Sequence, residues 1–243
     1  MTKRSSIRSA LARGQAYALL ARAFGRPDSD FQSEVRDGTF RQSLEEAFQV
    51  LRCPEPARAA MTLDGDASGE SLTPAFQRLF SPSVDGNCPP YETEYTGAHV
   101  FMRQQQLADV AGFYRAFGLR VAPAFRERPD HVAAELEFMA VLALKEAQAL
   151  ARGQRGNAAT CRRARARFLR EHLGRWLAAY TQRLSPIAGG GFYAGLVALA
   201  RDFVAWDAAQ AGVQPDIAAL RAMAPPGAPL ACPTPGGERY APS

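Results

Sequence analysis

The chain has 243 residues, of which 47% are hydrophobic and 22% charged, proportions typical of a globular protein with a sizeable core. Its 29 Lys and Arg against 24 Asp and Glu leave a net charge of +5, a mild excess that permits an anionic partner without arguing for one. No apolar run reaches the length of a membrane span, and Arg8 and Arg13 interrupt the segment where an export signal needs an apolar stretch, so we expect a cytoplasmic protein without membrane insertion.

Helical periodicity of the apolar residues dominates the chain. Thr73 followed by Pro74 predicts a helix start, Gly118 predicts a helix end, and Asp130 is a good candidate for an N-cap. In chain order, helices are predicted over residues 5–25, 30–38, 40–52, 55–63, 73–80, 103–119, 130–152, 158–184 and 192–212. The span 158–184 contains Gly174 and forms either one kinked helix or two, and "SPIAGGG" (185–191) predicts a loop.

No segment shows the alternation of β-branched and polar residues that is typical of a strand, and no repeat recurs at a fixed period. We therefore predict an all-α fold, a single compact domain of about ten helices over residues 1–223. Residues 224–243 are rich in Pro and Gly and predict a mobile tail, in which Cys232 is an incidental thiol.

The sequence offers no motif for catalysis or metal binding. It contains no nucleophile elbow, phosphate-binding loop, dinucleotide fingerprint or H-E-x-x-H zinc motif. The three histidines lie far apart, and the four cysteines form no C-x-x-C pair and have no histidine at a metal-ligand spacing. We predict reduced thiols, no catalytic residue and no metal site, and therefore a protein that is not an enzyme.

One helical stretch is strongly basic, which raises nucleic-acid binding as an alternative function. Six arginines could follow a phosphate backbone along it: Arg162, Arg163, Arg165, Arg167, Arg170 and Arg175. The competing interpretation is a solvated helix face, because Phe168, Leu169 and Leu173 give the same helix an ordinary apolar stripe. No helix-turn-helix, zinc finger or pattern of stacking aromatics accompanies the arginines, so we expect no nucleic-acid partner.

A locally acidic window is the strongest candidate for a binding site. No Lys or Arg lies between Arg78 and Arg103, while Asp85, Glu92 and Glu94 fall inside that window. Aromatic residues lie beside these acids at positions 80, 91 and 95, and a second acidic cluster surrounds His131. Carboxylates next to apolar side chains suit a ligand that is both basic and apolar. The alternative is that the tyrosines pack the loop onto the core and the acids stay in water, and the residues alone leave both open.

Five stretches in order resemble the TorD/DmsD/NarJ family of redox-enzyme maturation chaperones. They are "YALLARAFGRPD" (17–28), "FQRLF" (76–80), "PPYETEYTG" (89–97), "ADVAGFYRAFGL" (108–119) and "ERPDHVAAELEFMAVL" (127–142). Thr93 stands where the family has Ser, which keeps the hydroxyl. The hinge sequence Glu127-Arg128-Pro129-Asp130-His131 departs from the branch in which proline directly follows the glutamate, so the branch, and whether its client carries a twin-arginine leader, stay open.

The resemblance implies an all-helical, non-enzymatic chaperone. It implies that the partner is the apo catalytic subunit of a molybdopterin-dependent oxidoreductase, often bound at its N-terminal twin-arginine leader peptide. It further implies that molybdopterin enters the client while the chaperone holds it, so that the chaperone itself binds no cofactor stably. The oligomeric state is either a monomer or a domain-swapped dimer.

The family's binding residues, carried over to this chain, are Phe76, Leu79, Phe80, Tyr91, Glu92, Tyr95, Asp130 and His131. We expect Glu92, together with Glu94 or Asp130, to face the leader's arginines, and the apolar side chains of the set to line a groove for its apolar stretch. Asp130 has a competing role as a helix cap, and His131 is either a pH-sensitive contact or a capping or packing residue.

Overall fold

The computed structural model describes residues 2–53, 63, 71–80, 88–96, 100–122, 125 and 127–217 of the chain, without the side chains of residues 100 and 101. Over these residues the predicted all-α fold is confirmed. The helices are α1 (Lys3–Ala23), α2 (Ser29–Arg36), α3 (Thr39–Leu51), α5 (Leu72–Phe80), α6 (Val100–Ala116), α7 (Val132–Ala151), α8 (Arg155–Glu171), α9 (Leu173–Ala188) and α10 (Phe192–Gln210), with a 3-10 turn η1 (Glu92–Glu94).

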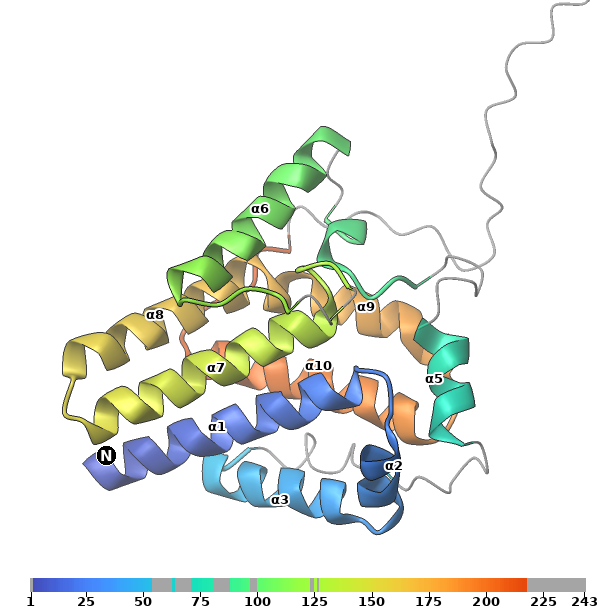
Figure 1. Cartoon of the computed structure of the whole chain (residues 1–243), viewed down its shortest axis with the longest axis horizontal. Helices are drawn as coiled ribbons and strands as arrows, with labels where there is room; N and C mark the ends of the chain where they lie inside the picture. The colour runs from blue at the N-terminus through green and yellow to red at the C-terminus, as the bar shows by residue number, and fades with distance from the viewer. Residues whose placement is uncertain are drawn as a thin grey trace, which may run out of the picture.

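The long helices form a bundle in which α1 and α7 lie side by side and run in opposite directions (Figure 1). These two helices share the most extensive contact in the described part of the molecule, followed by α7 with α8, α1 with α3, and α10 with α9. Gly14 permits the close approach of α1 to α7, because a Cβ at this position would lie 3.0 Å from two carbons of Leu144. Lys3 Nζ donates to Ala151 O at 3.2 Å, which joins the start of α1 to the end of α7.

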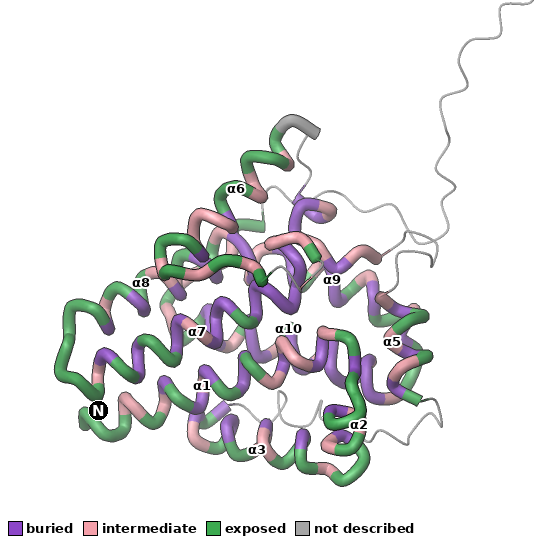
Figure 2. The backbone as a smooth tube through the Cα atoms, in the orientation of Figure 1, coloured by how far each residue is buried: buried purple, intermediate pink, exposed green. Residues whose placement is uncertain are grey.

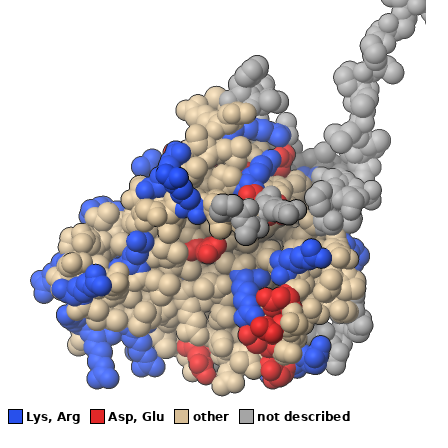
Figure 3. Space-filling model, in the orientation of Figure 1, with Lys and Arg blue, Asp and Glu red and all other residues tan. Residues whose placement is uncertain are grey.

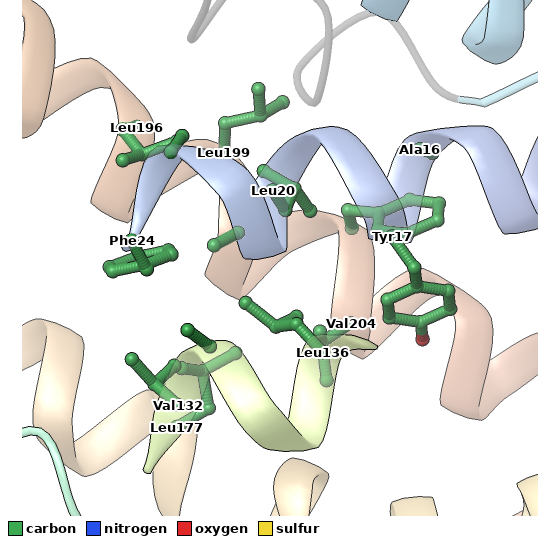
Figure 4. Packing of buried hydrophobic residues seen from close by; sticks show 14 of the residues in the cluster. Ala16, Tyr17, Leu20, Phe24, Val132, Leu136, Leu177, Leu196, Leu199 and Val204 are labelled. Atoms are coloured by element: carbon green, nitrogen blue, oxygen red, sulfur yellow. The ribbon is translucent and has the colours of Figure 1, made fainter. Parts of the chain in front are cut away.

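Buried residues recur along α1, α7 and α10 (Figure 2), and most of them are apolar. Leu20, Leu136 and Val204 come from these three helices and meet in the core, with Tyr17 close by (Figure 4). The burial of this cluster supplies the main favourable term for folding.

A buried ionic network also joins α1, α8 and α10. The Asp207 carboxylate is inaccessible to solvent and accepts hydrogen bonds from Arg13 Nε at 2.8 Å, from Tyr17 Oη at 2.8 Å and from the Arg165 guanidinium. Burial, followed by the charge of Asp207, raises the pKa of Tyr17 well above its ordinary value, so this hydroxyl stays a donor. Arg165, one of the six arginines of the basic stretch, therefore lies in the core.

The observed helix ends correct two sequence predictions and decide between the two alternatives left open for a third. The long helix begins at Val132 and its N-cap is His131, whose Nδ1 accepts from Ala133 N at 3.1 Å. Asp130 is not the cap, because its carboxylate is bonded to other groups. The span 158–184 contains two helices that meet at His172, not at Gly174. The predicted 185–191 loop is shorter, because α9 continues through Pro186 to Ala188. Pro186 lies in the last turn of α9, so the hydrogen bond that its missing N–H removes is close to the helix end.

Some predictions fall outside the described residues: the 55–63 helix except Leu63, positions 81–87 and 97–99 of the loop, and the 224–243 tail with Cys232. The domain boundary at residue 223 likewise stays a prediction. Among the helices that the structure describes, none is both long enough and apolar enough to cross a membrane.

Candidate functional site

Two of the predicted motifs pair with each other through their backbones. Tyr91 and His131 form an antiparallel β-bridge, in which Val132 N donates to Pro90 O at 2.9 Å and Glu92 N donates to Asp130 O at 3.0 Å. We call residues 88–96 and 127–131 together the loop–hinge site. The bridge brings Tyr91, Glu92, Asp130 and His131 into one place from segments about 40 residues apart.

Asp130 holds the loop–hinge site together from inside. Its side chain is 0% exposed, and its Oδ2 accepts from Thr93 N at 3.1 Å and from Thr93 Oγ1 at 2.8 Å. Arg128 completes the set, with Nε 3.0 Å from Asp130 Oδ1 and Nη2 3.1 Å from Oδ2. A buried carboxylate with this many charged and neutral donors is a structural anchor, and in this conformation it does not face a client.

Arg128 neutralises the acidic window from within the chain. Its guanidinium lies 4.1 Å from the centroid of the Tyr91 ring and 3.4 Å from Glu94 Oε1, and it donates to Thr93 Oγ1 at 3.0 Å. Arg103 Nη1 lies 3.3 Å from the same Glu94 oxygen. The site thus already contains a guanidinium stacked on an aromatic ring and bonded to carboxylates, the recognition predicted for a client arginine. The predicted binding set omitted Arg128, although the motif contains it.

Tyr91 presents the accessible aromatic surface of the site. It is half-buried, and its hydroxyl donates to the exposed Glu127 carboxylate. Burial, followed by the bond to Glu127, raises the pKa of Tyr91, so the hydroxyl stays protonated and acts as a donor. Glu127 and Glu94, whose side chain is 23% exposed, are therefore the carboxylates of this site that a ligand can reach.

Glu92 lies in the interior and connects the loop to the helices beneath it. It is 1% exposed, and its carboxylate lies 3.0 Å from Nδ1 of His172, the residue between α8 and α9. His172 Nε2 lies in turn 3.4 Å from the exposed Asp109 on α6. The predicted contact between Glu92 and a client arginine is therefore not available in this conformation, and that role stays a prediction.

Glu92 also has a second buried carboxyl as a neighbour. Glu135 on α7 accepts from Trp176 Nε1 at 3.0 Å and is inaccessible to solvent. Burial, followed by the charge of Glu92, raises the pKa of Glu135 well above its ordinary value. A protonated Glu135 can donate a hydrogen bond to Glu92, which explains how two carboxyl groups lie next to each other in the protein interior. The sequence places these partners 43 and 80 residues from Glu92, with no local signal for either.

Tyr95 packs inward rather than toward a ligand. It is 1% exposed, and its ring stacks on Trp176 with centroids 5.5 Å apart. Its hydroxyl lies 3.5 Å from Cys88 Sγ. Aromatic contacts continue from Tyr95 to Tyr180 and Phe24 and then reach α5 at Phe80.

The predicted α5 residues pack mainly on other parts of the bundle. Phe76 and Phe80 are half-buried, with ring centroids 5.0 Å apart, and both contact Tyr193 of α10. Leu79 is buried in the core. The α5 side chains therefore connect to the loop–hinge site through the aromatic series and not through the backbone pairing that joins the loop to the hinge.

His131 is a neutral packing and capping residue. It is buried, with its ring 5.3 Å from that of Tyr91 and 5.7 Å from that of Phe125. Burial lowers its pKa to about 4 from the ordinary 6.5, although the nearby Glu127 and Asp130 charges act in the opposite direction. The capping alternative of the sequence analysis is confirmed by the bond from Ala133 N.

An apolar pocket of about 140 Å³ lies beside the hinge, between α6, the connector after it and α7. Tyr114, Val121, Phe125 and Phe138 contribute to its walls, and the exposed Glu137 is at its rim. Tyr114 Oη donates to Pro129 O at 2.7 Å, which fixes the pocket against the hinge. The predicted binding set contains no residue of this pocket, and the apolar residues between the two predicted helices were the available signal.

The comparisons with known proteins now bear on this site. The family model for the nitrate reductase delta subunit matches residues 38–182, which include both halves of the loop–hinge site. The chain belongs to the nitrate reductase delta subunit family. This membership confirms the resemblance to the TorD/DmsD/NarJ chaperones.

Three relatives of this chain are named as chaperones. The perchlorate reductase assembly chaperone of Dechloromonas aromatica is 33% identical over 204 residues, 82% of this chain and 89% of the relative. The dimethyl sulfide dehydrogenase assembly chaperone of Rhodovulum sulfidophilum is 32% identical over 213 residues, 79% of each chain. The chaperone TorD of Vibrio cholerae is 30% identical over 138 residues, 56% of this chain and 60% of the relative. These relatives support a chaperone role, and their names agree with the prediction that the chain is not an enzyme.

Among the residues that the structure describes, no group of three or more His, Cys, Asp and Glu side chains could hold a metal ion. The buried Asp130 carboxylate of the loop–hinge site accepts from Thr93 and Arg128, and the buried Glu135 beside the site accepts from Trp176. Hydrogen bonds to carboxylates and the stacking of Arg128 on Tyr91 are the interactions that the site contains.

Proposed function

We propose that the protein is an assembly chaperone that binds the apo catalytic subunit of a molybdopterin-dependent oxidoreductase at its twin-arginine leader peptide. Family membership and the names of the relatives support the chaperone role. The observation that carries the leader-binding step is the position of Arg128, stacked on Tyr91 and bonded to Glu94. A site that holds one guanidinium of its own chain has the chemistry to hold another.

In the binding step, the guanidinium of a leader arginine replaces that of Arg128. A leader arginine approaches the accessible carboxylates Glu94 and Glu127 and competes with Arg128 for Glu94 and for the face of Tyr91. Glu92 and Asp130 stay buried and hold the loop against the hinge, so they position the site and do not touch the leader. Because one guanidinium replaces another, the electrostatic gain of the exchange is small, and apolar contacts supply most of the affinity.

The apolar pocket beside the hinge suits the leader's apolar stretch. It lies next to Phe125, whose ring contacts His131, which in turn contacts Tyr91. An apolar side chain of the leader enters this pocket, while the rim carboxylate Glu137 adds to the negative charge near it. Half-buried Phe76 and Phe80 offer a second apolar surface on α5 for a longer leader.

Cofactor insertion belongs to the client in this proposal. The chaperone holds the catalytic subunit in its apo form and delays export until molybdopterin is in place, and it binds no cofactor stably itself. The partner is then the redox-enzyme subunit, consistent with relatives whose names refer to perchlorate reductase and dimethyl sulfide dehydrogenase.

Calorimetry with a synthetic twin-arginine leader peptide tests the proposal. Glu94→Gln together with Glu127→Gln is expected to weaken binding about tenfold or more, because two charge-assisted contacts are lost. Glu45→Gln on α3 is the matched control and leaves the affinity unchanged. A leader with both arginines replaced by lysine loses bidentate and stacking geometry and binds more weakly. Equal affinity for all these combinations contradicts the assignment.

Variants of Arg128, which competes with the leader, and of the buried Glu92 sharpen this test. Arg128→Gln removes the internal competitor, so a folded variant is expected to bind the leader more tightly than the parent. Glu92→Gln leaves the affinity of the folded variant unchanged in our scheme. If Glu92→Gln abolishes binding without lowering Tm, Glu92 contacts the leader directly and the loop opens on binding.

The nucleic-acid alternative loses support from the arginine contacts. Arg165 is buried against Asp207, Arg162 pairs with Glu146 at 3.2 Å, and Arg167 pairs with Glu171 at 2.6 Å. Arg170 also pairs with Glu171, at 2.5 Å. Four of the six arginines are thus engaged with carboxylates of their own chain, which makes this stretch a poor track for phosphates.

A further inference from the structure

A large groove lies between α1, α3 and the end of α10, with a volume of about 1110 Å³. We call it the α1/α3/α10 groove. It is distinct from the loop–hinge site: in Figure 1, α3 lies at the bottom of the molecule and η1 near the top, with α1 and α7 between them. None of the residues predicted to bind the leader lines this groove.

Among the residues that the structure describes, the lining of the groove carries more positive than negative charge. Arg8 and Arg52 are exposed at its walls, and the side chains of both lack an ion pair or hydrogen bond with any residue that the structure describes. Arg13 at its floor is bonded to the buried Asp207. Glu46 is the one carboxylate among the described residues that line it. No Asp or Glu precedes Asp28 in the sequence, and basic side chains cover the start of α1 (Figure 3).

The remaining lining suits a peptide chain better than a phosphate group. Leu11 is 48% exposed there, and Trp206 is half-buried, so the groove offers apolar surface between its charges. Gln15, Gln49 and Gln210 add exposed side-chain amides. An amide both donates and accepts hydrogen bonds, which is what an extended peptide backbone requires of a partner.

Arg52 is positioned at the groove by the end of α3. It has φ 57° and ψ 44° and is the one non-glycine residue with a positive φ in the described part of the chain. This left-handed conformation is strained for arginine and relaxed for glycine. Arg52 is the C-cap of α3, where a left-handed residue is common, so this conformation ends the helix and leaves the unpaired guanidinium at the edge of the groove.

We propose that the α1/α3/α10 groove binds an acidic, partly apolar segment of a partner protein in an extended conformation. The charge of this ligand is opposite to that of the leader peptide, so the chaperone presents two surfaces of opposite preference. Arg8 and Arg52 bind carboxylates, Leu11 and Trp206 contact apolar side chains, and the glutamines bind the backbone. A lipid bilayer is the less suitable anionic partner, because the basic residues line a concave groove that a bilayer surface cannot enter.

Fluorescence anisotropy with the full chain tests this proposal. The probe is a short fluorescein-labelled peptide of Glu, Leu and Ser, and its counterpart carries Lys in place of Glu. The Glu peptide is expected to bind, the Lys peptide at least tenfold more weakly, and Arg8→Glu with Arg52→Glu reduces binding of the Glu peptide at least tenfold. Arg41→Glu, a charge reversal on the exposed side of α3 outside the groove, is the matched control and retains binding.

Arg52→Gly separates a binding role from a folding role. Glycine removes the guanidinium and relieves the backbone, so Tm is expected to stay equal or rise while the affinity for the Glu peptide falls. The proposal is overturned if the Glu and Lys peptides bind equally, or if the charge-reversal variant binds like the parent. It is also overturned if vesicles of phosphatidylglycerol bind the chain through Arg8 and Arg52 while the Glu peptide does not.

Discussion

The loop–hinge site and the α1/α3/α10 groove treat charge in opposite ways. In the loop–hinge site, Asp130 and Glu94 are paired with arginines of the same chain, and Glu92 lies next to His172 and Glu135. In the groove, Arg8 and Arg52 have no such partner among the described residues. A local excess of one charge in the sequence therefore has two outcomes, an internally satisfied network or an open surface. Which of them occurs depends on whether other parts of the same chain supply groups of opposite charge.

This difference implies different sensitivities to mutation. In our proposals, residues of the loop–hinge site contribute to both the fold and the recognition of a ligand, whereas Arg8 and Arg52 of the groove contribute little to the fold. Stability measurements can therefore test the comparison before any ligand is known.

Asp130→Ala should produce the largest loss of stability. It removes the acceptor of Thr93 N, Thr93 Oγ1 and Arg128, and leaves these groups around a cavity, so we expect about 3–5 kcal/mol of destabilisation in urea unfolding. Arg8→Ala in the groove is the contrasting variant, with a change of roughly 0.5 kcal/mol or less. Similar losses for the two variants would remove the distinction between the regions.

Acid should destabilise the loop–hinge site through His131. Its pKa is about 4 in the folded chain and near 6.5 when unfolded, so the unfolded state binds the proton more readily between these values. The stability contributed by neutral His131 is therefore present above pH 6.5 and is lost as pH falls toward 4, by up to about 3 kcal/mol. His131→Asn keeps an N-cap acceptor and should show a smaller loss over this window in parallel urea titrations. Identical pH profiles would show that His131 titrates normally.

Glu135→Gln should act in the opposite pH direction. The pKa of Glu135 is raised above its ordinary 4.5, so its contribution is present below that value and is lost as pH rises. The amide is a neutral donor to Glu92 and can still accept from Trp176. We expect the variant to gain on the order of 1 kcal/mol relative to the parent between pH 5 and pH 8. A constant difference between the two proteins at all pH values would refute a protonated Glu135.

Arg52→Gly should give the smallest change, and a favourable one. Relief of the left-handed backbone is expected to stabilise the chain by roughly 0.5–1 kcal/mol, measured as a small rise in Tm. Arg41→Gly, in the helical part of α3, is the counterpart and should lower stability by about 1 kcal/mol. Destabilisation by Arg52→Gly would mean that its side chain supports the fold, contrary to the comparison.

The sequence predicted the fold well where a signal is local. Apolar periodicity located most of the helices, because one face of each is buried against the bundle. The cap of α7 was placed one residue early, because Asp130 and His131 are both able to cap and the choice depends on Thr93 and Arg128. Gly174 drew attention to the α8–α9 break, but the chain turns at His172, and Gly174 is needed because a Cβ there would lie 2.3 Å from Leu169 O.

The sequence predicted which segments form the candidate site but not how their side chains point. The motifs named Glu92 and Asp130, and only the fold shows that both are buried, because their partners come from elsewhere in the chain. The groove escaped notice because its walls come from three helices far apart in sequence. The available signal was the opposite of the acidic window. No acidic residue precedes Asp28, so the first part of the chain carries only basic charge.

The two tryptophans of the chain lie one at each region, and this gives the molecule a built-in optical readout. Trp176 is buried beneath the loop, stacked on Tyr95, and Trp206 lines the groove. Replacing either tryptophan with phenylalanine leaves a single emitter. Quenching or a spectral shift of the remaining indole then reports which surface a partner occupies, and a partner that bridges both surfaces changes the emission of both single-tryptophan proteins.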